Sequence, residues 1–168
     1  MREFLAPELG YRFFYDLVNY SVRVGCTCAL PNSGASVLFP GVIEVVPNDF
    51  LLYGTDAPRV AYRISIAAVD APEITELDAG LFGAGPLVQY GQADLAGLEA
   101  EQIDLNGVPA LRLKDVFSGV RPIEVHIIAL HDSQFYEILV EAVPGTLDNN
   151  DFDDYQSVLD TFHFGPVR

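Results

Sequence analysis

Hydrophobic and polar positions alternate most regularly in the last third of the chain, between residues 122 and 164. Residues 123–130 begin with an apolar residue at every second position and then become apolar throughout. This pattern predicts a strand whose far end is covered on both faces. Residues 135–143 alternate again, and the polar stretch 131–134 has the length of a hairpin connection. We therefore predict a β-hairpin that ends at Pro144-Gly145, because proline cannot donate to a strand ladder.

A different period follows the hairpin. Apolar residues recur at spacings of three, three, one and three, which places them on one stripe of a helix: Phe152, Tyr155, Val158, Leu159 and Phe162. Residues 148–151 precede this stripe and carry short polar side chains that can accept hydrogen bonds at a helix N-terminus. The pattern predicts an amphipathic helix that lies across the hairpin and buries its apolar stripe.

Shorter apolar segments upstream predict further strands, at residues 10–15, 20–24, 36–39, 42–46, 60–69, 101–105 and 108–117. Asn106-Gly107 separates the last two and is a preferred dipeptide of tight hairpin turns, since it tolerates positive φ. Pro40-Gly41 indicates a tight turn or a break in an edge strand. Residues 70–101 hold five glycines, which predict loops with short helices at 73–81 and 94–101.

Several of these segments resemble one known superfamily. The likeness rests on the aromatic strand Gly10–Tyr15, on Asn106-Gly-Val-Pro-Ala110, on Phe135-Tyr-Glu-Ile138 and on the closing stretch Tyr155–Phe164. Together with the order of elements, these segments resemble the PsbP-like superfamily, most closely its bacterial members, which are often exported or lipid-anchored.

The resemblance implies an α+β fold in which an antiparallel sheet is flanked by helices on both faces, an α/β/α sandwich. It also implies that no catalytic centre is shared across members. The plant members are extrinsic photosystem subunits that influence calcium and chloride retention. No binding residue is carried across from them to this chain.

Length and charge narrow the classes of partner. At 168 residues, half of them hydrophobic, the chain predicts a single domain spanning residues 1–168 with its own core. Nine basic residues against 24 acidic ones give a formal charge of −15, which repels phosphate backbones. We therefore predict no nucleic-acid binding. We expect an unidentified protein or small-molecule partner, and a monomer or weak homodimer; the acidity is compatible with cations or a basic partner.

The sequence also bears on membranes and location. No apolar run approaches the 18 residues that span a bilayer, so we expect no membrane insertion. Glu3, Glu8 and Asp16 occupy the region where a signal peptide needs an unbroken apolar run. We expect either a cytoplasmic protein or an extracytoplasmic one whose leader was removed.

Reactive residue types are few, and they form no recognised catalytic motif. Cys26 and Cys28 are separated by one residue, and a disulfide across a single residue is strained in an extended chain, so we interpret them as half-buried thiols on a strand, with metal or redox chemistry as the alternative. We interpret His126, His131 and His163 as structural or surface residues. The chain contains no Gly-x-Ser-x-Gly motif. We predict that it is not an enzyme and that it needs no cofactor.

One acidic loop supplies the oxygen ligands that a hard cation prefers. Asp148, Asn150, Asp151 and Asp154 offer carboxylate and amide groups, so a calcium site is an alternative to helix capping there. It departs from an EF-hand loop, which needs oxygen and glycine where Phe152 and Asp153 stand.

These observations favour a non-catalytic binding or scaffolding domain, with the soluble part of an exported or surface protein as one setting. A calcium-binding module is the first alternative and a hydrolase the second. A binding domain predicts a concave apolar patch or a paired sheet edge without convergent titratable groups. A hydrolase predicts a pocket with a histidine and a carboxylate in hydrogen-bond reach.

Overall fold

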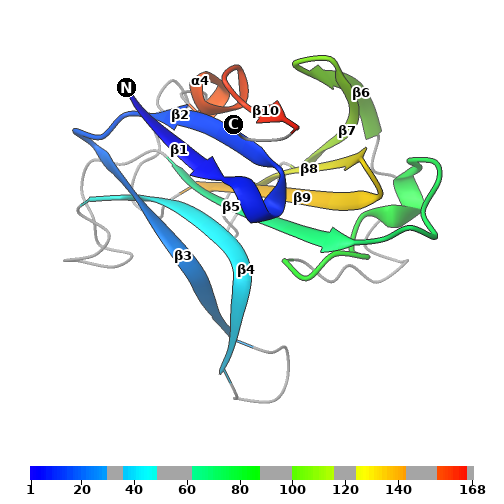
Figure 1. Cartoon of the computed structure of the whole chain (residues 1–168), viewed down its shortest axis with the longest axis horizontal. Coiled ribbons are helices and arrows are strands. Elements are labelled where there is room, and N and C mark those ends of the chain that lie inside the picture. Colours follow the sequence, from blue (N-terminus) through cyan, green and yellow to red (C-terminus); the bar gives the residue numbers. More distant parts are fainter. Residues whose placement is uncertain (30–35, 49–61, 88–99, 116–123, 143–154, 166–168) are drawn as a thin grey trace.

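A computed structural model describes residues 1–29, 36–48, 62–87, 100–115, 124–142 and 155–165 (Figure 1). Most of the described residues lie in strands. The elements are β1 (Arg2–Ala6), η1 (a 3-10 turn, Pro7–Leu9), β2 (Tyr11–Tyr15), β3 (Tyr20–Ala29), β4 (Ser36–Pro47), β5 (Tyr62–Asp70), η3 (a 3-10 turn, Ala79–Leu81), β6 (Ala100–Leu105), β7 (Val108–Asp115), β8 (Glu124–His131), β9 (Gln134–Ala142), α4 (Gln156–Leu159) and β10 (His163–Phe164).

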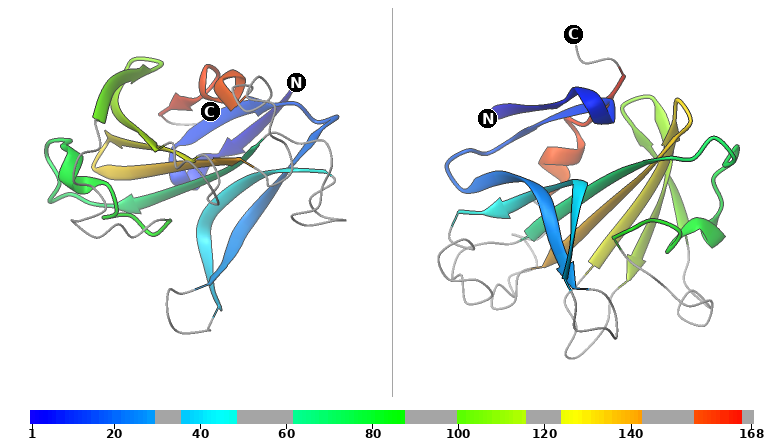
Figure 2. Two further views of the ribbon diagram at one scale, coloured as in Figure 1. Left: turned by 180° about the vertical axis from the view of Figure 1, so that it is seen from behind. Right: turned by 60° about the horizontal axis from the view of Figure 1, so that its bottom comes forward.

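The strands form two antiparallel sheets. Within the described ranges, the larger sheet has seven strands in the order β3-β4-β5-β9-β8-β7-β6, and the smaller has three in the order β1-β2-β10. The smaller sheet and α4 lie over the same face of the larger sheet (Figures 1 and 2). We call this face of the larger sheet the inner face and the opposite one the outer face.

The hairpin predicted for the last third of the chain is confirmed. β8 and β9 pair from Glu124 opposite Glu141 to His131 opposite Gln134. The connecting Asp132 and Ser133 both have positive φ, at 50° and 62°, as a tight type I′ turn requires. The turn predicted at residues 106–107 is confirmed as well, with φ values of 51° and 93° between β6 and β7.

The larger of the two hydrophobic clusters among the described residues lies between the inner face and the smaller sheet, and the smaller cluster lies on the outer face beneath residues 71–82. Every second residue of β2 and β9 is buried in the larger cluster: Tyr11, Phe13, Tyr15, Tyr136, Ile138 and Val140. The Phe162 ring lies between the layers, stacked on Tyr11 with ring centroids 5.0 Å apart and parallel to Phe13 at 6.2 Å. Alternation within each strand therefore sends aromatic and branched side chains from both sheets into one shared core.

The predicted α/β/α sandwich is wrong. Among the described residues, the inner face is covered by the smaller sheet together with the short helix α4, and the outer face carries the 3-10 turn η3 but no α-helix. Residues 73–78 form no helix, and only η3 follows them. A second helix was predicted at 94–101. Its two described residues, 100 and 101, lie in strand β6, and residues 94–99 lie outside the described ranges. The described chain is a mostly β protein of two packed antiparallel sheets.

The predicted closing helix is shorter than its apolar stripe. The described stripe residues are all buried, as predicted: Tyr155, Val158, Leu159 and Phe162. Phe152 lies outside the described residues. The helix nevertheless ends early, because Thr161 donates its hydroxyl to the Val158 carbonyl and accepts the backbone N–H of Phe14 in β2. The chain then pairs with β2 as β10.

The β3–β4 hairpin extends well beyond the smaller sheet (Figure 1). The sequence predicts a tight turn or a break in an edge strand at Pro40-Gly41. β4 continues through both residues, and the change that occurs beside them is a shift in its pairing with β3. The register of β3 on β4 shifts between Val24 and Cys26, where Gly25 has a φ of 84°. A bulge of this kind bends a strand and interrupts its ladder.

Candidate functional site

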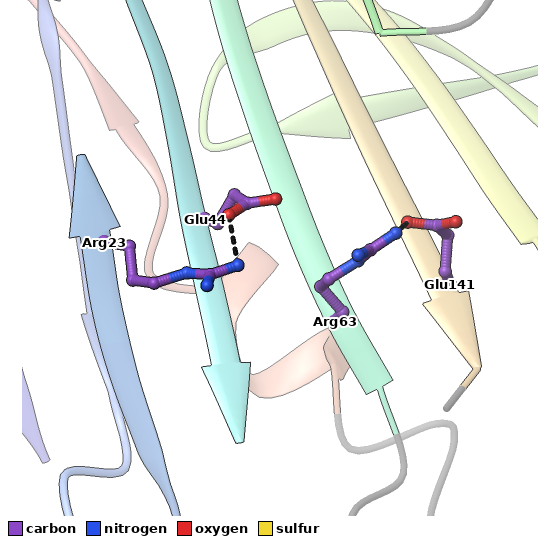
Figure 3. Close-up of polar contacts among 4 residues, drawn as sticks. All are labelled: Arg23, Glu44, Arg63 and Glu141. Atoms are coloured by element: carbon purple, nitrogen blue, oxygen red, sulfur yellow. Dashed lines mark hydrogen bonds and ion pairs between the residues drawn. The ribbon is translucent and has the colours of Figure 1, made fainter. Parts of the chain in front are cut away.

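The outer face carries charged side chains that are paired across neighbouring strands (Figure 3). Arg23 lies directly opposite Glu44, with 2.6 Å between the guanidinium and the carboxylate. Arg63 lies opposite Glu141 and donates to the same carboxylate oxygen through Nε at 2.9 Å and through a terminal nitrogen. Direct cross-strand pairs of opposite charge stabilise a sheet, so we assign these four residues a structural role.

A third pair on the outer face is fully enclosed. His126 Nε2 lies 2.8 Å from Glu137 Oε1, and both side chains are 1% exposed. The other carboxylate oxygen accepts the backbone N–H of Leu87 at 2.7 Å. The Phe82 ring meets the imidazole edge-on, with centroids 5.2 Å apart. Residues 82–87, which we call the sealing segment, therefore cover the pair, and a substrate has no access to it in this conformation.

This enclosed pair is the feature that sequence reasoning missed. His126 was expected to be a structural or surface residue, and the structure buries it against a carboxylate of the next strand. The hairpin register contained the signal: Ile128 faces Glu137 and His126 faces Leu139. His126 and Glu137 are therefore diagonal neighbours on one face, and aligning the two predicted strands would have revealed them.

Gly85 allows the backbone of the sealing segment to approach Glu137. A Cβ atom at position 85 would overlap the Glu137 carboxylate. We expect Gly85→Ala to lower the free energy of unfolding by about 1–3 kcal/mol, the usual range for overpacking a buried site. Urea denaturation measures this loss. Gly107→Ala is an informative companion, because a Cβ there meets open space and strains only the backbone at φ 93°. A fully neutral Gly85→Ala would contradict the close approach.

A second cluster surrounds the β8–β9 turn and opens to a cavity of about 600 Å³. The Tyr136 hydroxyl lies 2.9 Å from the Leu9 carbonyl and 2.7 Å from Gln134 Oε1. Burial, with a smaller contribution from Asp132, raises the pKa of Tyr136 to about 12. The hydroxyl is therefore a protonated donor that ties β9 to η1. The His131 ring packs against Phe164, with centroids 5.4 Å apart.

An apolar groove lies between the two sheets at the side of the molecule where β1 and β3 are the outermost strands. It has a volume of about 440 Å³ and is lined by residues 4–9 of β1 and η1 and by Val24 and Ile43 of the β3–β4 hairpin. We call it the edge groove. Seven of its eight lining residues are apolar, and Glu8 is the titratable one. It can bind an apolar group, but its lining offers no acid–base pair.

Two of the lining side chains are unusually exposed for their type. Val24 is 69% exposed although it faces Ile43 across the hairpin, and Leu5 of β1 is 45% exposed. Single exposed apolar residues are common on protein surfaces. Here they border one concavity between two strand edges, and such a patch is typical of an interaction site.

Some of the candidate site residues from the sequence lie outside the residues that the structure describes. Asp148, Asn150, Asp151 and Asp154 all fall in an undescribed range, so the calcium hypothesis stays a prediction. The backbone of Cys26 and Cys28 lies in β3, as predicted, and their side chains are not described. Among the described residues, no three histidine, cysteine or acidic side chains are placed to share a metal. Within the same residues, no helix has the length and apolarity to cross a membrane.

Comparison with known proteins informs the fold alone. No protein-family model and no curated protein matches the chain. A crystal structure of a protein from Bacteroides thetaiotaomicron VPI-5482 is similar, with a TM-score of 0.50 and 10% sequence identity. The match covers 96% of this chain and 47% of that one, so the chain spans about half the length of its neighbour. The resemblance to the PsbP-like superfamily stays a prediction.

Proposed function

We propose that this chain is a non-catalytic binding domain and that the edge groove is its binding surface. The observation that carries the proposal is the placement of exposed Leu5 and Val24 beside a concavity with an almost wholly apolar lining. A groove of this composition gains free energy when an apolar group displaces its water, at roughly 25 cal/mol per Å² of apolar area buried.

The arrangement of the polar groups supports the same proposal. Four described arginines each form an ion pair with a carboxylate on an adjacent strand. The pairs are Arg12–Glu3, Arg23–Glu44, Arg63–Glu141 and Arg112–Glu101. The enclosed pair His126–Glu137 has the short separation that a hydrolase needs, but it lies beneath the sealing segment rather than in a pocket. These polar groups act within the fold, while the edge groove faces solvent.

Selection from a random peptide display library tests the proposal. We expect wild-type protein to enrich peptides whose binding is lost in Val24→Asp, because a carboxylate in the groove opposes burial of apolar groups. Val18→Asp is the matched control, since Val18 is 82% exposed in the β2–β3 turn and does not line the groove. Enriched peptides that bind both variants equally would contradict the groove as the binding surface.

A separate experiment tests the proposal that the domain is not catalytic. We expect no turnover of a chromogenic acetate ester by wild-type protein above that of His126→Asn. An esterase activity that His126→Asn abolishes while the variant keeps its cooperative unfolding would instead support the hydrolase alternative. It would also require the sealing segment to open.

A further inference from the structure

We infer that the edge groove takes an extended apolar segment of a partner protein, which adds as a strand to the free edge of β3 and carries basic residues beside its apolar stretch. This inference rests on the proposed function and specifies its partner. It combines three features of the described chain: an unpaired strand edge, an apolar concavity next to it, and a strongly acidic charge.

The strand edge supplies the backbone partners. β3 is the end strand of the larger sheet, and β4 is the strand that pairs with it among the described residues. Between Ser21 and Val24 the register on β4 is regular, so alternate N–H and C=O groups of β3 point away from β4. An edge of this kind is a template for an added strand. The bulge at Gly25 limits the regular part of the template on that side.

The groove supplies the side-chain contacts. Residues of an added strand point alternately to the two faces of the sheet, so every second side chain would face the smaller sheet. On that side it would meet Val24, and across the groove Phe4, Ala6 and Leu9, which face the core side of the smaller sheet. β1 is also an end strand among the described residues, but it has five residues, whereas β3 has ten and pairs with β4 on both sides of its bulge. The longer strand offers more backbone pairs, so we assign the added strand to β3.

Charge selects the kind of segment. The chain carries a formal charge of −15, and Glu8 lines the edge groove. The nearby guanidinium groups of Arg12 and Arg23 already pair with Glu3 and Glu44. Unpaired acidic charge at the groove attracts a basic segment and repels a second copy of this chain. The occupant is therefore a different protein.

Three synthetic peptides of about ten residues, a usual strand length, test the inference by fluorescence anisotropy on the full chain. The first alternates valine and threonine and ends in two lysines. The second ends in two glutamates instead, and the third replaces a central residue of the first with proline. We expect the lysine peptide to bind, and the other two to bind at least roughly tenfold more weakly, because charge and strand pairing are each lost. Raising the salt to about 0.5 M should reduce the advantage of the lysine peptide.

Amide exchange then locates the added strand. With the lysine peptide bound, we expect slower exchange at the backbone amides of residues 21–24, and no slowing in Val24→Asp. Equal binding of the proline peptide would overturn strand addition while leaving the groove as a binding surface. Equal binding of the glutamate peptide would overturn the basic partner. A dimer of the peptide-free protein that buries β3, detected by sedimentation and by protection of the same amides, would replace the partner with a second copy.

Discussion

Glu137→Ala is expected to lower the free energy of unfolding by about 3 kcal/mol, the upper end of the usual cost of leaving a buried hydrogen-bonding group without its partner. The carboxylate is 1% exposed, lies 2.8 Å from His126 Nε2 and accepts the N–H of Leu87. Its removal leaves His126 Nε2 and the Leu87 N–H facing an apolar methyl group in place of the carboxylate that they contact. Chemical denaturation followed by circular dichroism measures the loss.

An exposed pair provides the matched control for this variant. Glu101 pairs with Arg112 across the β6–β7 hairpin, and its side chain is 60% exposed. Solvent screens such a pair, so Glu101→Ala should cost less than about 1 kcal/mol. Similar losses in Glu137→Ala and Glu101→Ala would show that the sealing segment does not enclose the His126–Glu137 pair in solution.

Phe162→Ala is expected to cost about 3–5 kcal/mol, through a different mechanism. Its ring is fully buried between the sheets, where it stacks on Tyr11 and lies 4.9 Å from the ring of Phe164. Truncation removes these apolar contacts and leaves a cavity between the two sheets. The cavity stays open because strand pairing holds the surrounding side chains in place. Thermal unfolding monitored by near-ultraviolet circular dichroism reports both the stability and the loss of aromatic packing.

Phe14→Ala controls for the loss of a phenylalanine as such. Phe14 is adjacent to the buried Phe13 in β2, but it points away from the core and is 36% exposed. We expect its replacement to cost less than about 1 kcal/mol, as is usual for substitutions outside the core. If Phe14→Ala were as destabilising as Phe162→Ala, the assignment of the inner side of β2 would be wrong.

Sequence patterns determined the local parts of this fold. The turns at residues 106–107 and 132–133 join strands that are adjacent in the chain, so alternation and turn chemistry suffice to place them. The closing segment needed distant information. Its apolar spacing suits a helix, but the Thr161 hydroxyl bonds the backbone of Phe14, 147 positions away, and β10 then joins β2. Resemblance to a helix-flanked superfamily added weight to the wrong alternative.

The candidate site was harder to predict than the fold. Val22 and Val24 alternate with polar neighbours in β3, and that pattern indicates side chains facing a core. The smaller sheet reaches Val22, which packs partly against the core, but it leaves Val24 exposed. The edge groove exists because the β3–β4 hairpin is longer than the layer that covers it. No local pattern reports the relative length of two layers.

Amide hydrogen exchange along β3 in the free protein tests the open strand edge most directly. If that edge is open, amides that point to β4 should exchange slowly, and the alternate amides of residues 21–24 should exchange at least about tenfold faster. β9 is the internal control, since it pairs with β5 and β8 on its two sides and should show protection at consecutive residues. Uniformly slow exchange along residues 21–24 would mean that the edge is already paired, and it would contradict the binding surface proposed for this protein.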